Sequence, residues 1–167
     1  MSDVITFYLE MDSPEEHRNR KSKPERLEVV EARVKEGRFN RFLYELVGKQ
    51  WGWVDKLKES DEEWANYAED ESLRTWVAYS EGAVAGYYEL QKQDEGNIEL
   101  CYFGLAPKFL GKGFGGYLLS HAIDSAWALE GARRVWVHTC TLDHESALPN
   151  YQSRGFKLYK TETELGG

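Results

Sequence analysis

Cysteine is scarce in this sequence: Cys101 and Cys140 are the two in a chain of 167 residues. Both fall in segments whose alternation predicts inner β-strands. A free cysteine in such a position behaves as a small hydrophobic side chain, and a disulfide does not persist in a reducing cytoplasm. We therefore expect two buried thiols and no disulfide.

Long hydrophobic runs are missing as well. No apolar stretch approaches the roughly 20 residues that a membrane-spanning helix needs. The N-terminal stretch 1–12 (MSDVITFYLEMD) is interrupted by charges and lacks the apolar core of a signal peptide. We expect a cytoplasmic protein with no membrane partner.

Basic residues are outnumbered, with 21 Lys and Arg against 29 Asp and Glu and a net charge of −8. This balance argues against nonspecific binding to nucleic acid. It does not exclude an anionic cofactor, because backbone amides can bind one. The net negative charge of the protein would favour a cationic acceptor. We therefore expect a small-molecule partner and no nucleic acid.

Strand and helix patterns alternate along the chain. They predict strands over 4–11, 27–34, 73–79, 83–90, 98–105, 133–142 and 156–162, and helices near 39–47, 60–67, 118–127 and 145–154. Residues 12–24 read as a polar loop, and His17 and His121 read as surface residues. With no repeat or internal linker, residues 1–167 are expected to form one mixed α/β domain.

The stretch 97–127 organises the chain as a strand, a glycine-rich turn and a helix. The strand is apolar on both alternating faces, so we expect it to be central and covered on both sides. Glu99 alone interrupts it. The predicted faces are Ile98, Leu100 and Tyr102 on one side and Cys101, Phe103 and Leu105 on the other.

The turn between strand and helix contains four glycines, Gly111, Gly113, Gly115 and Gly116. Glycines just before a helix leave backbone N–H groups bare at the positive end of the helix dipole, which favours a phosphorylated ligand. A P-loop is excluded because Lys112 is followed by glycine rather than Ser or Thr. A dinucleotide-binding fold also fits poorly, because the next strand ends without an acid and too few residues remain for its sheet.

Two motifs give the sequence a family resemblance. The run 104–115 (GLAPKFLGKGFG) resembles motif A of the GCN5-related N-acetyltransferases, the GNAT family, with Gly113 and Gly115 at its glycine positions and Leu110 where Arg or Gln is usual. Residues 144–156 resemble motif B and keep its Ala, Tyr, Gly and Phe spacing, with His144 at its Asn position. Together the matching stretches cover residues 97–127 and 144–156, and the first 70 residues add little.

The resemblance implies a fold and a cofactor. The fold is a mixed, mostly antiparallel central sheet of about six to seven strands, splayed at the cofactor cleft, with helices on both faces. The cofactor is acetyl-CoA, with no metal. Its pantetheine arm would follow the exposed backbone of Phe103, Gly104 and Leu105. The remaining cofactor-binding residues implied are Leu110, Gly111, Lys112, Gly113, Phe114, Gly115, Gly116 and His144.

Three of these residues leave alternatives open. His144 either helps to hold the pantetheine or sulfur region, as the Asn at this position does in relatives, or caps a helix. Gly104 in a strand interior indicates either a bulge or pantetheine contact, or else filler in a tight core. Leu110 cannot supply the usual side-chain donor to a phosphate, so its backbone N–H and Lys112 would have to compensate. We expect weaker cofactor binding rather than none.

The resemblance also assigns chemistry. Tyr151 matches the general acid that protonates the departing CoA sulfur, against the alternative of a packing tyrosine. Glu99 stands where histone-type relatives place a general base, with a solvated or salt-bridged glutamate and a water chain as alternatives. Trp51 and Trp53 lie in the segment that binds the acceptor in relatives, and core packing is their simpler explanation. A metal site from His138, Cys140 and His144 lacks a fourth ligand.

The expected activity is transfer of an acetyl group from acetyl-CoA to a primary amine of a small molecule, or to a peptide N-terminus or lysine, by direct attack in a ternary complex. Transfer of a larger acyl group is one alternative. A non-catalytic CoA-binding sensor or interaction module is another. The sequence leaves the oligomeric state open, a homodimer included.

Overall fold

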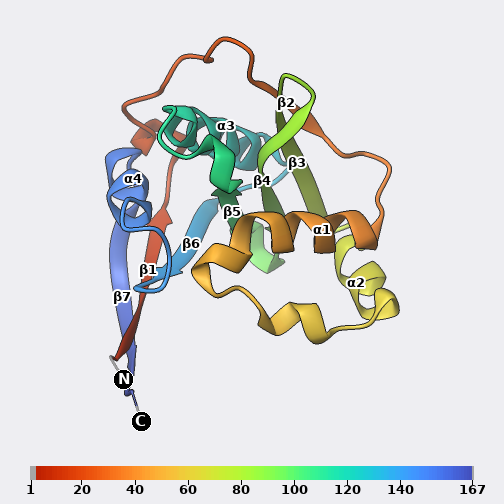
Figure 1. Ribbon diagram of the computed structural model, residues 1–167. Helices are drawn as coiled ribbons and strands as arrows, with labels where there is room; N and C mark the ends of the chain where they lie inside the picture. The colour runs from red at the N-terminus through yellow and green to blue at the C-terminus, as the bar shows by residue number, and fades with distance from the viewer. Residues whose placement is uncertain (1–2, 167) are drawn as a thin grey trace.

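The computed structural model of the protein describes residues 3–166. These residues form a single sheet in the order β2-β3-β4-β5-β6-β1-β7, with helices on both faces (Figure 1). The strands are β1 (Val4–Met11), β2 (Glu28–Glu31), β3 (Leu73–Ser80), β4 (Ala83–Lys92), β5 (Asn97–Leu105), β6 (Arg134–Cys140) and β7 (Lys157–Glu164). The helices are α1 (Gly37–Gly48), α2 (Asp61–Ala68), α3 (Phe114–Ala128) and α4 (Ala147–Ser153).

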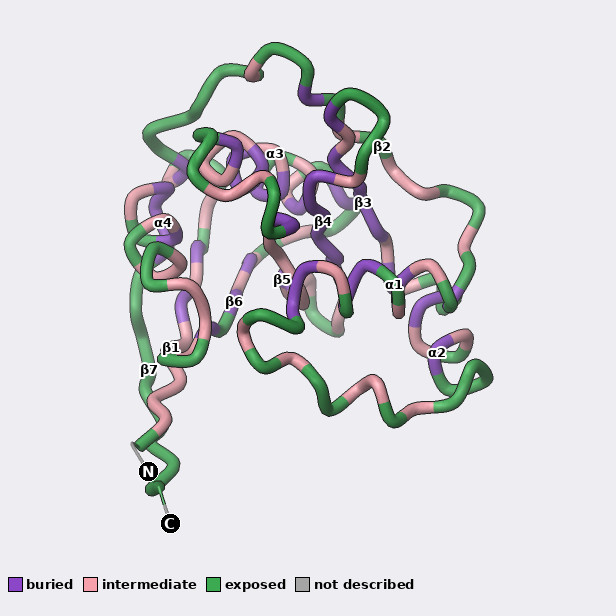
Figure 2. The backbone as a smooth tube through the Cα atoms, viewed as in Figure 1, coloured by how far each residue is buried: buried purple, intermediate pink, exposed green. Residues whose placement is uncertain are grey.

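Two apolar cores hold the layers together. The larger core packs α3 and α4 against one face of the sheet, with Leu118 and Leu119 of α3 fully buried. The smaller core packs α1 on the other face, where Leu43 and Val47 contact Val77 and Tyr87 of the sheet. Figure 2 shows the buried backbone concentrated in the central strands and the sheet-facing sides of these helices. No helix within residues 3–166 is long and apolar enough to cross a membrane.

The N-terminal strand β1 lies next to the C-terminal strand β7, which forms one edge of the sheet. β1 is inserted between β6 and β7 and pairs antiparallel with both, so Val4 lies opposite Glu164 and the two ends of the chain lie side by side (Figure 1). β5 and β6 form the parallel pair among the described strands. The mostly antiparallel mixed sheet expected from the resemblance is therefore confirmed.

The predicted faces of β5 are wrong beyond Leu100. Leu90 of β4 pairs with Leu100, but its neighbour Glu89 pairs with Tyr102, so Cys101 is an extra residue in the ladder. Such a β-bulge reverses the alternation that follows it. Tyr102 therefore joins the α1 face, and Phe103 joins the core on the α3 face.

Several local predictions also need correction. The second strand covers Glu28–Glu31 rather than 27–34, because those four residues pair with β3. The fourth helix is shorter than 145–154, since a turn precedes it in which the Ala147 amide donates to the His144 carbonyl. His17 is buried rather than on the surface, and the loop around it contains a 3-10 turn, Pro14–Glu16.

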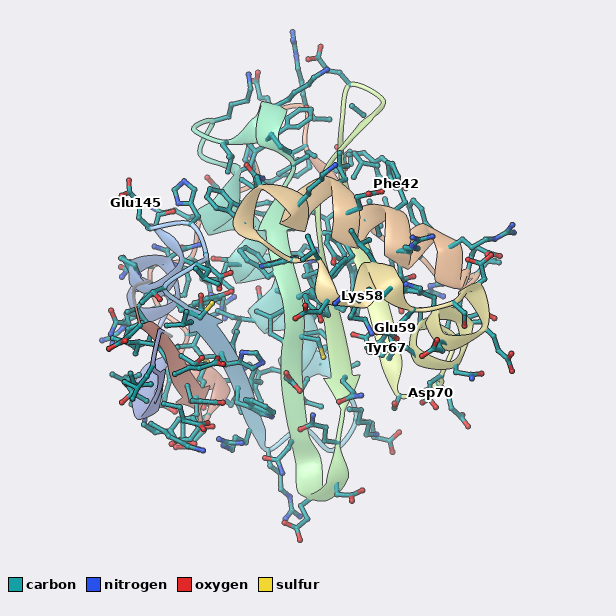
Figure 3. The ribbon with its side chains drawn as sticks, turned by 60° about the horizontal axis from the view of Figure 1, so that its bottom comes forward. Phe42, Lys58, Glu59, Tyr67, Asp70 and Glu145 are labelled. Carbon is teal, nitrogen blue, oxygen red and sulfur yellow. The ribbon has the colours of Figure 1, made fainter. Side chains whose placement is uncertain are left out.

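The first two helices form largely as their sequences predict. The Ser60 hydroxyl accepts from the Glu63 amide while the Glu63 carboxylate accepts from the Ser60 amide, which starts α2 with a capping box. In α1 the apolar stripe ends at Gly48 as expected, but Phe42 remains 48% exposed. Figure 3 shows this helix and labels Phe42, together with Tyr67 of α2.

Candidate active site

Strands β5 and β6 separate partway along their length. Their parallel ladder runs through Asn97–Leu100 of β5 and ends opposite Val137 of β6. β5 nevertheless continues to Leu105, still paired with β4 on its other side. The bulge at Cys101 lies where the ladder ends, and a bulge bends its strand. One edge of β5 therefore leaves its neighbour and faces an opening in the sheet.

A cavity occupies this opening, with about 710 Å³ of empty space, part of it continuous with solvent. Both separated strands, the α1–α2 connection and α4 line it. It brings together these predicted site residues: Trp51, Trp53, Phe103, Gly104, Leu105, Leu110, Gly115, His144 and Tyr151.

A groove along the glycine-rich turn adjoins this cavity. Gly111, Gly113, Gly115 and Gly116 line it. The residues that it shares with the cavity are Leu105, Leu110, Gly115, His144, Ser146 and Asn150. The cavity between the strands and the groove at the start of α3 therefore lie side by side.

The backbone of the glycine-rich turn requires glycine. Gly111 and Gly113 have φ of 76° and 80°, a left-handed conformation that other residues adopt at a cost. A Cβ placed on either would meet no atom within 4 Å, so both present bare backbone to open space. α3 begins at Phe114, so the amides of its first turn have no partner in a preceding turn. The turn is thus a pre-formed set of donors for an anion.

Three other predicted cofactor residues have explanations in packing. Gly104 allows α1 to approach β5, because a Cβ there would lie 2.5 Å from Val47 Cγ1. Leu110 packs against the larger core, and its amide donates to the Pro107 carbonyl at 3.4 Å. The amide expected to compensate for the missing side-chain donor is therefore engaged in a turn. Phe114 turns its ring into the core, whereas Lys112 is exposed.

Tyr151 projects from α4 into the cavity. Its ring packs between Phe103 and Phe156, with centroids 6.1 and 5.8 Å away, and the residue is 6% exposed. Burial, with a smaller contribution from Asp143, raises the pKa of its hydroxyl above the ordinary tyrosine value. The hydroxyl is therefore protonated at neutral pH.

Glu99 is not among the residues that line the cavity. It belongs to the stretch where β5 and β6 are still paired, and its carboxylate accepts from Gln93 Nε2 at 2.9 Å. His138, which does line the cavity, places Nε2 3.7 Å from Glu99 Oε2. Burial raises the pKa of Glu99, and His138 and the hydrogen bond from Gln93 partly offset the rise. His138 thus links the partly buried carboxylate to the cavity.

The two predicted acceptor residues bridge the separated strands. Trp53 Nε1 donates to Asp143 Oδ1 at 3.1 Å across the opening, and its ring lies 5.3 Å from that of Tyr102. Trp51 makes an edge contact with His144, with ring centroids 5.0 Å apart. The α1–α2 connection is therefore fastened to the loop after β6, over one end of the cavity.

Sequence reasoning missed several residues of this site. Asp143 accepts from Thr139 Oγ1 at 2.5 Å and from the Cys140 amide at 3.0 Å, which fixes the carboxylate that holds Trp53. Its loop position, outside both motifs, gave no signal. His138 could have been found as the histidine on the strand that runs beside Glu99. Among residues 3–166, no group of three or more His, Cys, Asp or Glu side chains is arranged to hold a metal ion.

Comparison with solved structures gives the same fold. A GCN5-related N-acetyltransferase from Sphaerobacter thermophilus superposes with a TM-score of 0.67 at 17% identity, covering 98% of this chain and 50% of that one. A GCN5-related N-acetyltransferase from Kribbella flavida gives 0.64 at 12%, covering 98% and 61%. This chain therefore spans between half and two thirds of the length of these proteins.

A third structure is closer in length. The spermidine N-acetyltransferase from Vibrio cholerae, in complex with CoA and spermine, has a TM-score of 0.63 at 22% identity, with 80% of this chain and 82% of that one covered. A search of curated protein sequences finds no significant match.

The family model for the acetyltransferase (GNAT) family matches residues 40–156, which include the separated strands, the glycine-rich turn and α4. This protein belongs to the GNAT acetyltransferase family.

Proposed function

We propose that this protein transfers an acetyl group from acetyl-CoA to a primary amine of a small molecule. The observation that carries the proposal is that the groove at the glycine-rich turn adjoins the cavity beside Tyr151, with Leu110 and Gly115 lining both. A long cofactor with an anionic end and a reactive thioester end fits such a path.

The residues present fit coenzyme A at both ends of this path. Free amides around Gly113 suit the diphosphate. The amide-bearing pantetheine arm suits the edge of Phe103–Leu105 that β6 leaves unpaired, because an extended arm can pair with strand backbone. Bound in this way, the thioester end would lie among the side chains of the cavity.

The reaction replaces a C–S bond by a C–N bond and, in balance, moves one proton from the amine nitrogen to the sulfur. The neutral amine attacks the thioester carbonyl carbon, the C–N bond forms, the C–S bond breaks, and the amine loses one proton. Tyr151 donates its hydroxyl proton to the departing sulfur, which leaves as the thiol, and the tyrosine regains a proton from solvent before the next turnover. The hydroxyl is protonated at neutral pH, so the proton is in place when a thiolate develops.

Glu99 and His138 accept the proton that the amine loses. His138 lines the cavity and faces the Glu99 carboxylate at 3.7 Å, so the imidazole or a water beside it passes the proton toward Glu99. The raised pKa of Glu99 makes it a better base than an ordinary surface carboxylate.

Direct transfer is favoured over an acyl-enzyme. Cys101 lines the cavity, and a thiolate there would be a candidate nucleophile. Burial raises the pKa of Cys101 well above its ordinary value, and the Glu99 and Glu89 carboxylates raise it further. The thiol therefore stays protonated and weakly nucleophilic, which supports attack by the amine itself.

The acceptor end suits a small cationic amine. Trp51 and Trp53 provide aromatic faces beside the Asp143 carboxylate, and rings with a nearby acid attract ammonium groups. The spermidine N-acetyltransferase with the same fold holds spermine in its structure. A polyamine or a similar small amine is therefore the first acceptor class to test.

Tyr151→Phe tests the proposal. We expect kcat for acetyl transfer to an amine, followed by release of free thiol, to fall about 100-fold or more, with the Kd for acetyl-CoA changed less than about twofold because the ring stays in place. Tyr159→Phe, on the exposed strand β7, is the matched control and should leave both values unchanged. An unaltered kcat in Tyr151→Phe would remove this residue from the mechanism.

The same assay separates the alternatives. A non-catalytic CoA-binding module would bind acetyl-CoA without releasing thiol with any amine. A transferase of larger groups would turn over butyryl-CoA faster than acetyl-CoA.

A further inference from the structure

A buried arginine lies beside the glycine-rich turn without a counter-ion. Arg154, the residue after α4, is 5% exposed. Its Nη2 donates to Ser153 Oγ at 2.8 Å, but Nε and Nη1 have no hydrogen-bond partner among the described residues. Nη1 lies 3.3 Å from the position that a Cβ would take on Gly116, in the first turn of α3. The unpartnered guanidinium therefore faces the start of α3.

This placement is unfavourable unless an anion is bound. The N-terminus of a helix carries partial positive charge, so a buried cation beside it is repelled rather than stabilised. An unpaired buried charge also costs free energy of desolvation, and burial lowers the pKa of Arg154. An anion seated on the first-turn amides would compensate both the guanidinium and the helix end.

The side chain of a second basic residue, Lys21, packs against Gly116. The Lys21 side chain places Cγ 3.0 Å and Cε 3.7 Å from that same Cβ position on Gly116. The Lys21 amide donates to Ser120 Oγ of α3 at 3.3 Å, which fixes where the side chain starts. No carboxylate among residues 3–166 forms an ion pair with Lys21 or Arg154. The side of Gly116 that lacks a Cβ is therefore covered by two unpaired cations.

The loop that carries Lys21 is basic although the protein is acidic. Residues 17–26 (HRNRKSKPER) contain five Lys or Arg and one Glu, in a chain with a net charge of −8. The loop crosses above α3 (Figure 1). Its Arg18 amide and Asn19 Nδ2 donate to the carbonyls of Arg154 and Ser153, at 3.1 and 2.8 Å. The loop therefore fastens the end of α4 to α3. Its Arg20, Lys23 and Arg26 pair with Asp124, Glu28 and Glu81, whereas Lys21, beside Gly116, has no ion-pair partner among residues 3–166.

We propose that Arg154 and Lys21 bind the phosphates of coenzyme A, and so replace the side-chain donor that Leu110 lacks. The inference rests on the proposed function, since it assigns residues to the same cofactor. Lys21, with its flexible stem, turns its ammonium toward the bound phosphate. Arg154 then gains the counter-charge that it lacks in the free protein.

Calorimetric titration of the full chain with CoA, 3′-dephospho-CoA and pantetheine tests this. Arg154→Met keeps an unbranched stem but removes the charge, and Lys21→Met does the same above Gly116. We expect CoA affinity to fall about tenfold or more in Arg154→Met and about threefold or more in Lys21→Met. Arg26→Met, on the same loop but paired with Glu81, is the charge-matched control and should bind CoA as the wild type does.

Thermal melting of the ligand-free variants separates charge from packing. Arg154→Met should melt at or above the wild-type temperature, because it removes an unpaired buried charge. A loss of affinity for both CoA and 3′-dephospho-CoA would place the cations on the diphosphate, and a loss for CoA alone would place them on the 3′-phosphate.

Three results would overturn the inference. They are wild-type CoA affinity in Lys21→Met, wild-type CoA affinity in a folded Arg154→Met, and an equal loss of pantetheine binding, which would indicate damage to the fold. If Arg154→Met does not fold, Lys21→Met alone decides. Failure of the wild type to bind CoA would instead contradict the proposed function itself.

Discussion

At the scale of single residues, Glu99 combines partial burial with two polar partners. Glu99 is held by Gln93 on one oxygen and faces His138 with the other. Its pKa is raised because the surroundings disfavour the charged form more than these partners favour it. A carboxylate in this state remains protonated to a higher pH than an exposed one, which gives the enzyme a titration that activity can report.

The pH dependence of the rate should follow this group. If the deprotonated Glu99 carboxylate accepts the proton, kcat falls as the pH drops through a pKa above the ordinary carboxyl value of 4.5. Glu99→Gln should lower kcat and remove that limb of the profile. Glu130→Gln, an exposed residue after α3, should leave the profile unchanged. A profile of unchanged shape in Glu99→Gln would assign the limb to another group.

Stability changes with pH in the opposite direction to activity. A raised pKa means that folded Glu99 holds its proton more tightly than the unfolded chain does. Its contribution to stability is therefore present below the unfolded pKa and is lost as the pH rises through the folded pKa. Urea unfolding at several pH values should show a weaker dependence over this range in Glu99→Gln than in the wild type.

At the scale of elements, we infer that the glycine-rich turn and α3 bind an anion together. The turn places left-handed glycines at the mouth of the groove, and the helix supplies free amides behind them. A side chain introduced at one of these glycines would have two effects that experiments can separate. One is the conformational cost, which any glycine with positive φ carries, and the other is obstruction of the ligand, which is specific to this turn.

Gly113→Ala and Gly82→Ala form a matched pair. Both glycines have positive φ, 80° and 86°, and at both a Cβ would meet no atom within 4 Å. Each change should lower the free energy of unfolding by about 1 kcal/mol. Only Gly113→Ala, whose methyl group enters the groove, should also weaken CoA binding, by about tenfold or more. Calorimetric titration and urea unfolding measure the two effects, and equal CoA affinity in both variants would contradict the assigned phosphate site.

On the scale of the whole molecule, the opening in the sheet is lined by elements from both faces. β5, β6, α3, α4 and the α1–α2 connection all contribute to the cavity. A ligand that occupies the cavity and the groove would therefore connect elements from both faces of the sheet. Any ligand that binds the folded state alone also raises its stability by mass action.

Acetyl-CoA should therefore raise the melting temperature. At about 100 times its Kd the added stability is roughly 2.7 kcal/mol, which for a chain of this size corresponds to about 5–10 °C. NADH at the same concentration should give no shift, because the chain lacks the acid and further βα units of a dinucleotide fold. The reverse result, a shift with NADH and none with acetyl-CoA, would contradict both the cofactor and the proposed reaction.

The sequence by itself determined the elements with strong local signals. The helices near 39–47 and 60–67 depend on neighbours within a few residues, so local pattern suffices. The two motifs identified the family, and they placed Tyr151 and the glycine-rich turn near one another through spacing that relatives share.

Only the tertiary structure decided the features that depend on distant segments. The bulge at Cys101 arises from the register between β4 and β5, and no local pattern reveals it. The position of β1 between β6 and β7 joins residues from the two ends of the chain. The Trp53–Asp143 bond and the approach of Lys21 and Arg154 to Gly116 are likewise long-range. Strand pairing and loop packing bring these residues together, so their roles become visible only once the chain is folded.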